Sequence, residues 1–396
     1  MKINVVLAVG ILLSLYMAQG LLYPSGSIIS QSILLIILII GIYSLLRTLF
    51  LKMNNTVMYC MITFYLMVAL TFIISPKTVI GVKNEAIGVV STMGQFKGVC
   101  TGLLPFFVGY YASTKKNITD KIWIIIGCIY FVVAIATFFF LREMLMLEQG
   151  RDDVVNNAAY RLVVFIPFIP IFFKSNKFKL INYTIVVVSV ILIILGSKRG
   201  AIASMGVSLI FSVLYYVYKT RISIQKALAL LLFVLVGIFL LYRLVEANDY
   251  LMYRLEQTQS VGIGQRSIAY KTLFNHWLYD STGFEFLFGG GTCAAIEIWG
   301  NYAHNDWLEL LSSNGLFGVL IYAVLFVSFV RFIYKTNISP YYKLSMYLCI
   351  LLLFMQSVFS MGYMSSGNAM FMLLLGALTN KALKNGCDEK SIVIYR

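Results

Sequence analysis

The chain has 396 residues, of which 60% are hydrophobic and only 12% are charged. Soluble proteins carry about 25% charged residues, so this composition excludes an ordinary soluble enzyme and predicts an integral membrane protein. The formal net charge is +15, but the order of the basic residues along the chain favours membrane topology, and no nucleic-acid partner, as its cause.

Apolar stretches near the ~20 residues that cross a bilayer recur along the whole chain. A segment that crosses lipid must satisfy its own backbone hydrogen bonds, so each stretch is predicted to be a helix. We expect an all-α fold with about twelve transmembrane helices in one polytopic membrane domain, 1–396. The predicted spans are 3–22, 28–46, 56–74, 88–112, 122–141, 158–173, 180–196, 201–218, 227–245, 304–330, 344–361 and 367–380.

Lysine and arginine gather in alternate loops between these spans. If the N-terminus is cytoplasmic, the inner loops hold nineteen of the 31 basic residues and three of the 16 acidic ones. This pattern follows the positive-inside rule and predicts that both termini are cytoplasmic. The same parity places the loop 142–157, the turn 196–200 and a long loop, 246–303, on the outer face. A loop of that length is typical of a functional segment.

Part of the long loop is predicted to form a short amphipathic helix. Its shared face consists of Ile268, Thr272, Leu273, His276 and Trp277. Trp277 and Tyr279 suit anchoring at the membrane interface. The run Gly289–Gly291 resembles a phosphate cradle, but its spacing fits no nucleotide-binding fingerprint, and we interpret it as a tight turn.

Several cations fall on the predicted outer face, where the charge rule disfavours them. Lys198 and Arg199 lie in the turn SKRG. Arginine matches phosphate oxygens and Gly200 permits close backbone approach, so this turn predicts an anion site, with snorkelling to lipid headgroups as the alternative. Arg266 opens the long loop, where simple solvation is the alternative. Arg151 has acidic neighbours that suit a salt bridge.

Two cations lie within predicted spans. Arg161 falls just inside the span 158–173, and a cation buried there needs a partner. Lys97 lies in the middle of the span 88–112 and is the main feature that favours a secondary transporter.

His304 and His276 are the only two histidines of the chain. An imidazole titrates near pH 6.5, so His304, at the outer end of a span, suits a general base, although a lone histidine is more often structural. Asn305 and Asp306 suit capping of the helix that follows. Asp306 and Glu309 are alternative bases, or partners that orient His304. His276 is the weaker rival.

Cysteine spacing predicts no metal site and no disulfide framework. The six cysteines include no CxxC pair, and neither histidine lies at ligand spacing from them. We therefore expect no metal and no cofactor.

Taken in order, these motifs resemble the O-antigen ligase and O-antigen polymerase superfamily. The resemblance covers about residues 150–325, which we treat as the catalytic motif region. It comprises the segment GRDDVVNNAAYR, the turn SKRG, a long loop that opens with Arg266 and closes with a glycine-rich turn, and His304–Asn305 followed by nine residues, Gly315, two residues and Gly318.

The resemblance implies a GT-C type glycosyltransferase with one large periplasmic loop in the bacterial inner membrane. Its reaction is metal-independent and inverting, and its donor is an oligosaccharide on undecaprenyl pyrophosphate. Arg199 and Arg266 would bind the pyrophosphate, and His304 would deprotonate the acceptor hydroxyl. Residues expected in support are Lys198, Arg151, Arg161, Asn305 and Asp306.

The Lys198–Arg199 pair and the NNAAYR segment favour a polymerase of O-antigen or capsular repeat units over a ligase. A polymerase takes the next lipid-linked unit as acceptor, and a chain-length regulator is then a further partner. A ligase would transfer the glycan to lipid A-core, and some ligases carry a carboxylate in the last outer loop. That loop, 361–368, reads MGYMSSGN and has none. A flippase or transporter is the alternative from another class.

Overall fold

A computed structural model describes residues 4–51, 55–75, 78–80, 89–149, 154–174, 179–220 and 264–394, with the single residues Gln225 and Arg243. This part of the chain is almost wholly helical. Six of its helices are long and apolar enough to cross a membrane, so the chain is an all-α, multi-pass membrane protein. The apolar pattern did not predict one element, a short antiparallel hairpin of β1 (Thr78–Ile80) and β2 (Val89–Ser91).

The helices follow the predicted apolar segments in order. They are α1 (Val5–Met17), α2 (Ile28–Leu49), α3 (Thr56–Ile74), α4 (Thr92–Lys115), α5 (Asp120–Gln149), α6 (Ala159–Phe165), α7 (Ile169–Lys174), α8 (Lys179–Leu195), α9 (Arg199–Thr220), α15 (Asp306–Lys335), α16 (Pro340–Phe359) and α17 (Ala369–Ile394). The predicted span 227–245 lies, apart from Arg243, outside the described residues, so the count of twelve crossings stays a prediction.

The predicted span 158–173 is a broken helix. Between α6 and α7 the chain forms a single 3-10 turn, η1 (Ile166–Phe168). Pro167 and Pro170 lie at this break, as expected for residues that lack a backbone N–H and crowd the preceding turn.

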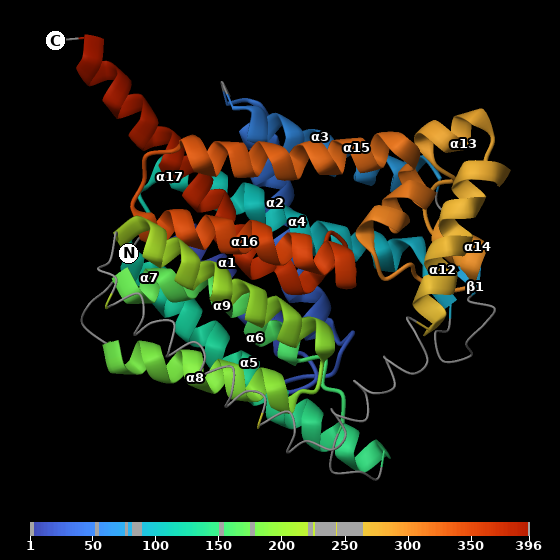
Figure 1. Cartoon of the computed structure of the whole chain (residues 1–396), viewed down its shortest axis with the longest axis horizontal. Helices are drawn as coiled ribbons and strands as arrows, with labels where there is room; N and C mark the ends of the chain where they lie inside the picture. The colour runs from blue at the N-terminus through green and yellow to red at the C-terminus, as the bar shows by residue number, and fades with distance from the viewer. Residues whose placement is uncertain are drawn as a thin grey trace.

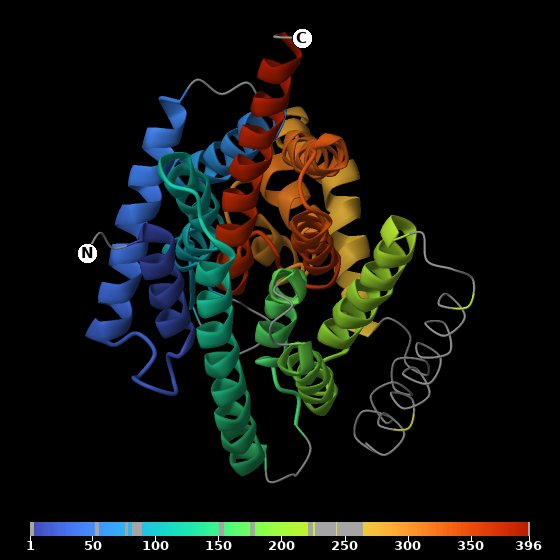
Figure 2. The ribbon, with the colours of Figure 1, turned by 90° about the vertical axis from the view of Figure 1, so that its left-hand side faces the viewer.

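The long loop is largely helical in its described part, 264–303. It contains α12 (Gly264–Asn275), the π-turn η3 (His276–Asp280), α13 (Gly283–Phe288) and α14 (Ala294–Trp299). We call residues 264–299 the cap. The start of α1 and the end of α17 lie toward one end of the molecule, and the cap lies at the other (Figure 1). α15 and α16 run along the long axis of the molecule toward the cap (Figure 1), so that both are seen nearly end-on from the end with the termini (Figure 2).

The helix predicted in this loop exists, but its predicted face is partly wrong. Ala269 and Leu273 are buried, whereas Ile268 is 57% exposed. Trp277 stacks on Phe286 at 4.4 Å between ring centres and donates to its carbonyl at 3.0 Å. The indole therefore packs the cap together, and Tyr279, 76% exposed, is the aromatic residue that remains available for the membrane interface.

The glycine-rich turn forms a joint with a kink in α15. Gly290 and Gly291 donate their N–H groups to the carbonyls of Ser312 and Ser313, at 2.8 and 3.1 Å. Gly315 has a φ of 62°, and a Cβ there would lie 2.4 Å from the carbonyl carbon of Leu287. Protein backbone thus fills the space that a phosphate cradle would need, which confirms the interpretation as a tight turn.

Glycines also bring α4 and α17 into close contact at the centre of the bundle. A Cβ on Gly109 would lie 2.0 Å from the carbonyl oxygen of Leu373, and a Cβ on Gly376 would lie 1.9 Å from that of Phe106. Small residues let helix backbones approach in this way within membranes. This contact helps to fix α4, and therefore Lys97, against the loop 361–368 that follows α16.

Candidate functional site

His304 lies in the turn that leads from α14 into α15. Its φ of 52° is in the left-handed region, which non-glycine residues seldom adopt and which is common at functional sites. Asn305 caps α15, because its side-chain oxygen accepts from the N–H groups of Trp307 at 3.0 Å and Leu308 at 3.1 Å. The predicted capping role is therefore confirmed for Asn305. Tyr270 of α12 donates to the carbonyl of His304 at 3.5 Å.

Glu309 holds the same turn from the first helical turns of α15. Its side chain is fully buried, and Oε2 accepts from the N–H of Ala303 at 3.1 Å. Within the part of the chain that the structure describes, Oε1 has no hydrogen-bond partner. Glu309 therefore fixes the residue before His304, which matches the predicted orienting role better than that of a base open to substrate.

Asp306 does not cap α15 and binds the loop 361–368 instead. Its carboxylate is fully buried and accepts from the N–H groups of Gly362 at 2.8 Å and Tyr363 at 3.0 Å. Tyr322 donates a third hydrogen bond at 2.8 Å. These donors occupy the carboxylate, so its geometry suits support of the loop rather than proton transfer.

Burial and two distant cations act on the His304 imidazole. Burial lowers its pKa from the ordinary value of 6.5, and the positive charges of Arg266 and Lys198 lower it further. Arg266 comes from α12 and Lys198 from the turn before α9. The structure therefore places two of the predicted cations around the predicted base, and it favours a neutral imidazole at pH 7.

Arg266 lies in the first turn of α12, not in an open loop as predicted. Its Nη1 lies 3.4 Å from the carbonyl oxygen of Phe359, a long hydrogen bond at the end of α16. The preceding carbonyl, that of Val358, accepts from Asn305 Nδ2 at 3.2 Å. The last turn of α16 thus holds both Arg266 and the residue that follows His304.

The turn before α9 is tightly packed against α6. Ser197 is buried with a φ of 50°, and Gly196 accepts from the N–H of Asn156 at 2.9 Å. A Cβ on Gly200 would lie 2.1 Å from the hydroxyl of Tyr160. Gly200 therefore makes room for Tyr160, and not for a ligand as we expected from the sequence. Arg199 begins α9 and is exposed.

Arg161 contacts the end of α1. Its Nη1 donates to the carbonyl of Met17 at 2.6 Å. Lys97 is not in the middle of a span, because α4 begins at Thr92 and Lys97 lies in its second turn. Arg151 lies outside the described residues.

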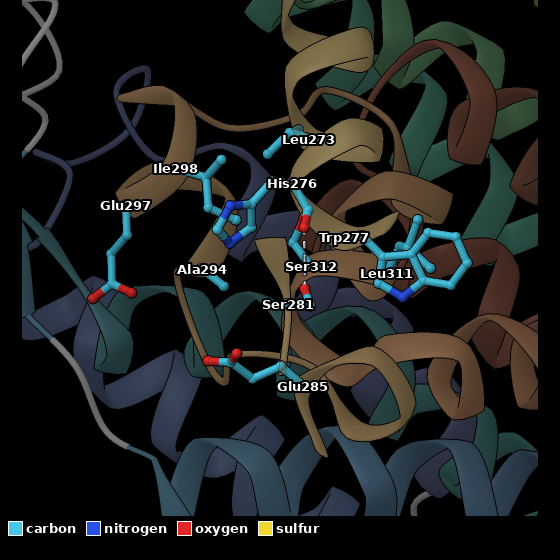
Figure 3. A pocket seen from close by; sticks show the side chains of 11 residues that line it. Leu273, His276, Trp277, Ser281, Glu285, Ala294, Glu297, Ile298, Leu311 and Ser312 are labelled. Carbon is cyan, nitrogen blue, oxygen red and sulfur yellow. Dashed lines mark hydrogen bonds between the residues drawn. The ribbon is translucent and has the colours of Figure 1, made fainter. Parts of the chain in front are cut away.

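His276 faces a separate cavity of about 80 Å³ within the cap. Figure 3 shows the imidazole there with Glu285 and Glu297 around it. Its Nδ1 lies 3.6 Å from Asp280 Oδ2. His276 thus belongs to the packing of the cap, in line with its prediction as the weaker rival of His304 for the role of base. Among the described residues, no cluster of three or more His, Cys, Asp or Glu side chains could hold a metal ion.

Sequence reasoning considered the loop 361–368 only for its lack of a carboxylate and missed its contacts with α4 and α15. Gly98 and Gly102 of α4 approach it so closely that a Cβ would lie 2.4 Å from the Met364 carbonyl and 2.7 Å from the Ser365 carbonyl. The spacing of the two glycines, four residues apart on one helix face, is a signal for such contact. Tyr160 and Tyr270 carried no comparable signal.

Comparison with known proteins adds no relative. Neither a scan against models of protein families nor a search of curated proteins gives a match.

Proposed function

We propose that this chain is a GT-C type glycosyltransferase that polymerises lipid-linked oligosaccharide repeat units. Its substrates are O-antigen or capsular units on undecaprenyl pyrophosphate, and it acts at the periplasmic face of the bacterial inner membrane. One observation carries the proposal: His304 is half-buried at the cap end, with the charges of Arg266 and Lys198 acting on it. A neutral base beside fixed cations suits a reaction whose leaving group is a diphosphate.

In this reaction an acceptor sugar hydroxyl attacks the anomeric carbon of the donor glycan. The hydroxyl proton passes to the neutral imidazole of His304 as the new C–O bond forms. The bond between the anomeric carbon and the diphosphate oxygen breaks, and its electron pair leaves with polyprenyl diphosphate. A single displacement of this kind inverts the anomeric centre. Arg199, Arg266 and Lys198 stabilise the charge that develops on the leaving diphosphate.

The lowered pKa of His304 serves this role. A base must be unprotonated when the acceptor arrives, and burial together with the neighbouring cations favours the unprotonated imidazole near neutral pH. The cations also interact with the donor diphosphate, so binding of the donor partly neutralises them. The imidazole then becomes more basic when both substrates are present.

An apolar groove supports the proposal that the substrate carries a long hydrocarbon chain. Its volume is about 930 Å³, and it opens between α9, α15 and α16. Aromatic and aliphatic side chains line it, among them Phe211, Tyr215, Phe326, Val330, Tyr347 and Phe354. Phe354 lies one turn before Ser357, whose hydroxyl accepts from Trp307 Nε1 at 3.1 Å. The groove thus ends close to the turn that carries His304, as a path for a polyprenyl chain should.

The position of Lys97 weakens the transporter alternative. A transporter is expected to place charges and broken helices near the membrane midplane. Lys97 lies only about 7 Å along the helix axis from the start of α4, at ~1.5 Å per residue. Lys97 therefore lies near the start of its helix, at the cap end, and no longer favours a transporter.

The test uses purified protein in detergent, a lipid-linked repeat unit and EDTA, with no other acceptor. We expect a ladder of longer lipid-linked glycans on a gel. Transfer that occurs only after lipid A-core is added would identify a ligase instead. Absence of transfer to either acceptor would contradict the glycosyltransferase proposal, and loss of transfer in EDTA alone would contradict metal independence.

A further inference from the structure

Lys97 and Arg161 are two cations at the cap end that the proposed reaction does not use. Lys97 Nζ lies 6.0 Å from the centre of the Tyr16 ring. Arg161 Nη1 donates to the carbonyl of Met17 at 2.6 Å. Tyr16 and Met17 are consecutive residues at the end of α1, so a cation from α4 and a cation from α6 both contact the last residues of this helix.

Neither cation is neutralised within the part of the chain that the structure describes. Lys97 contacts an aromatic face, and Arg161 contacts a backbone carbonyl; no carboxylate among the described residues forms an ion pair with either. The carbonyl end of α1 favours one nearby cation. One helix end does not account for two cations. A guanidinium also carries five N–H donors, and the hydrogen bond to Met17 uses one of them.

The loop 361–368 packs against both helices that carry this pair, α4 and α6. Gly98, the neighbour of Lys97, lies so close to the loop that a Cβ would be 2.4 Å from the carbonyl oxygen of Met364. The 3-10 turn in the loop, η4 (Ser366–Asn368), packs against both α4 and α6.

The same loop is also bound to the turn that carries His304. Asp306, two residues after His304, accepts from the N–H groups of Gly362 and Tyr363. The loop is therefore in contact with the helices of Lys97 and Arg161 and, through Asp306, with the first turn of α15. An acceptor that extends over this loop would reach from the cation pair to the base.

We propose that Lys97 and Arg161 bind the diphosphate of the second lipid-linked substrate, the acceptor; this inference rests on the proposed function. A polymerase must hold two polyprenyl diphosphates at one face of the membrane. The donor diphosphate leaves, whereas the acceptor diphosphate remains attached and keeps its charge. Two such anions repel each other, so each needs its own cations. Arg199, Arg266 and Lys198 serve the donor, and Lys97 and Arg161 serve the acceptor.

The experiment compares two fluorescent acceptors at limiting concentration with one lipid-linked donor. Both carry the same repeat-unit oligosaccharide, one on a short prenyl diphosphate and the other on an uncharged alkyl chain. We expect the wild-type protein to prefer the diphosphate acceptor in kcat/KM by about 10-fold or more, because hydrogen bonds to a charged group are stronger than those to neutral groups. Lys97→Gln should reduce that ratio toward one, and Arg161→Lys, which keeps the charge but not the bidentate fork, should reduce it less.

Two features keep this test decisive. Arg161→Lys retains a donor for the Met17 carbonyl and Lys97→Gln leaves that contact untouched, so both variants should fold. Lys116→Gln removes an exposed cation beyond the other end of α4 and should keep the wild-type ratio.

The outcomes separate the two proposals. Wild-type transfer at equal efficiency to both acceptors would overturn the acceptor site and favour ordinary phospholipid headgroups as its occupants. A full preference retained by both variants would overturn it as well. Absence of transfer to either acceptor would instead overturn the proposed function on which the site rests.

Discussion

The two ends of the helix bundle neutralise their cations in different ways. At the end opposite to the cap, Lys174 Nζ lies 2.8 Å from Asp120 Oδ2 and 2.7 Å from the hydroxyl of Tyr342. Lys381 donates to the same hydroxyl at 2.8 Å, and Tyr342 donates to Asp120. Four helices, α5, α7, α16 and α17, are joined there by a network that contains its own anion.

At the cap end, the buried carboxylates serve the backbone instead. Asp306 and Glu309 accept from backbone N–H groups, at Gly362 and Tyr363 and at Ala303 respectively. Among the described residues, Arg266 donates to the carbonyl of Phe359 and Arg161 to that of Met17, and neither forms an ion pair with a carboxylate. The difference indicates that cations at the first end hold the fold together. Those at the cap end are available for the anionic substrates that we propose.

The largest expected effect is that of His304→Asn. Asparagine tolerates the left-handed conformation of residue 304 and keeps hydrogen-bonding groups, but it is no base near pH 7. We expect ladder formation per folded protein to fall by about 10²–10⁴-fold, the usual contribution of a general base. His276→Asn makes the same change in the cap cavity and should retain most of the rate. Wild-type turnover by a folded His304→Asn protein would refute the base role.

The second effect concerns the donor cations. Arg266→Ala and Arg199→Ala should each reduce kcat/KM for the lipid-linked donor by roughly 10²-fold, as expected when a preorganised charge is removed. The corresponding lysine variants should lose less, because lysine keeps the charge but not the bidentate fork. Arg142→Ala, in α5, is the matched control. If alanine and lysine variants lost equally, charge alone would not explain the site.

Most of the described membrane helices could be predicted from the sequence, because the local apolar composition of a segment indicates a membrane helix. Each predicted span within the described residues contains a helix, and Asn305 caps α15 as its position suggested. The meeting of His304 with Arg266 and Lys198 was expected only from their shared outer face. No local pattern encodes that convergence, which depends on how α12 and the turn before α9 pack.

Other features escaped prediction because they depend on contacts between distant segments. The sequence places Lys97 in a long apolar run and cannot indicate that the helix starts only at Thr92, after a strand. Gly200 was expected to face a ligand, but Tyr160 fills that space. Asp306 was expected to cap its own helix, yet the backbone N–H groups that it accepts from lie more than fifty residues further along the chain.

A third prediction tests how the cap-end charges tune the base. Lys198 and Arg266 lower the pKa of His304, after burial, so Lys198→Met should raise that pKa toward its ordinary value. Only the neutral imidazole accepts a proton. The rate therefore falls as pH drops through the His304 pKa, and this acid limb of kcat/KM should move to higher pH in Lys198→Met. Lys198→Arg keeps the charge and should leave the limb in place. An acid limb that does not move in Lys198→Met would show that this charge does not act on the base.

The smallest effect on turnover is expected at the opposite end, from Asp120→Asn. The amide keeps an acceptor for Tyr342 but leaves Lys174 without a charged partner. Both side chains are about one-third exposed, so we expect stability in thermal unfolding to fall by only about 1 kcal/mol. Transfer per folded protein should stay at the wild-type level, because this network contacts no part of the proposed site. Lys116→Gln, an exposed change near the same end, should alter neither quantity.

A folded Asp120→Asn protein with reduced transfer would mean that the two ends are coupled. One route for such coupling is α16, which carries Tyr342 at its start and the carbonyl that Arg266 contacts at its end. The division between a structural end and a catalytic end would then have to be abandoned.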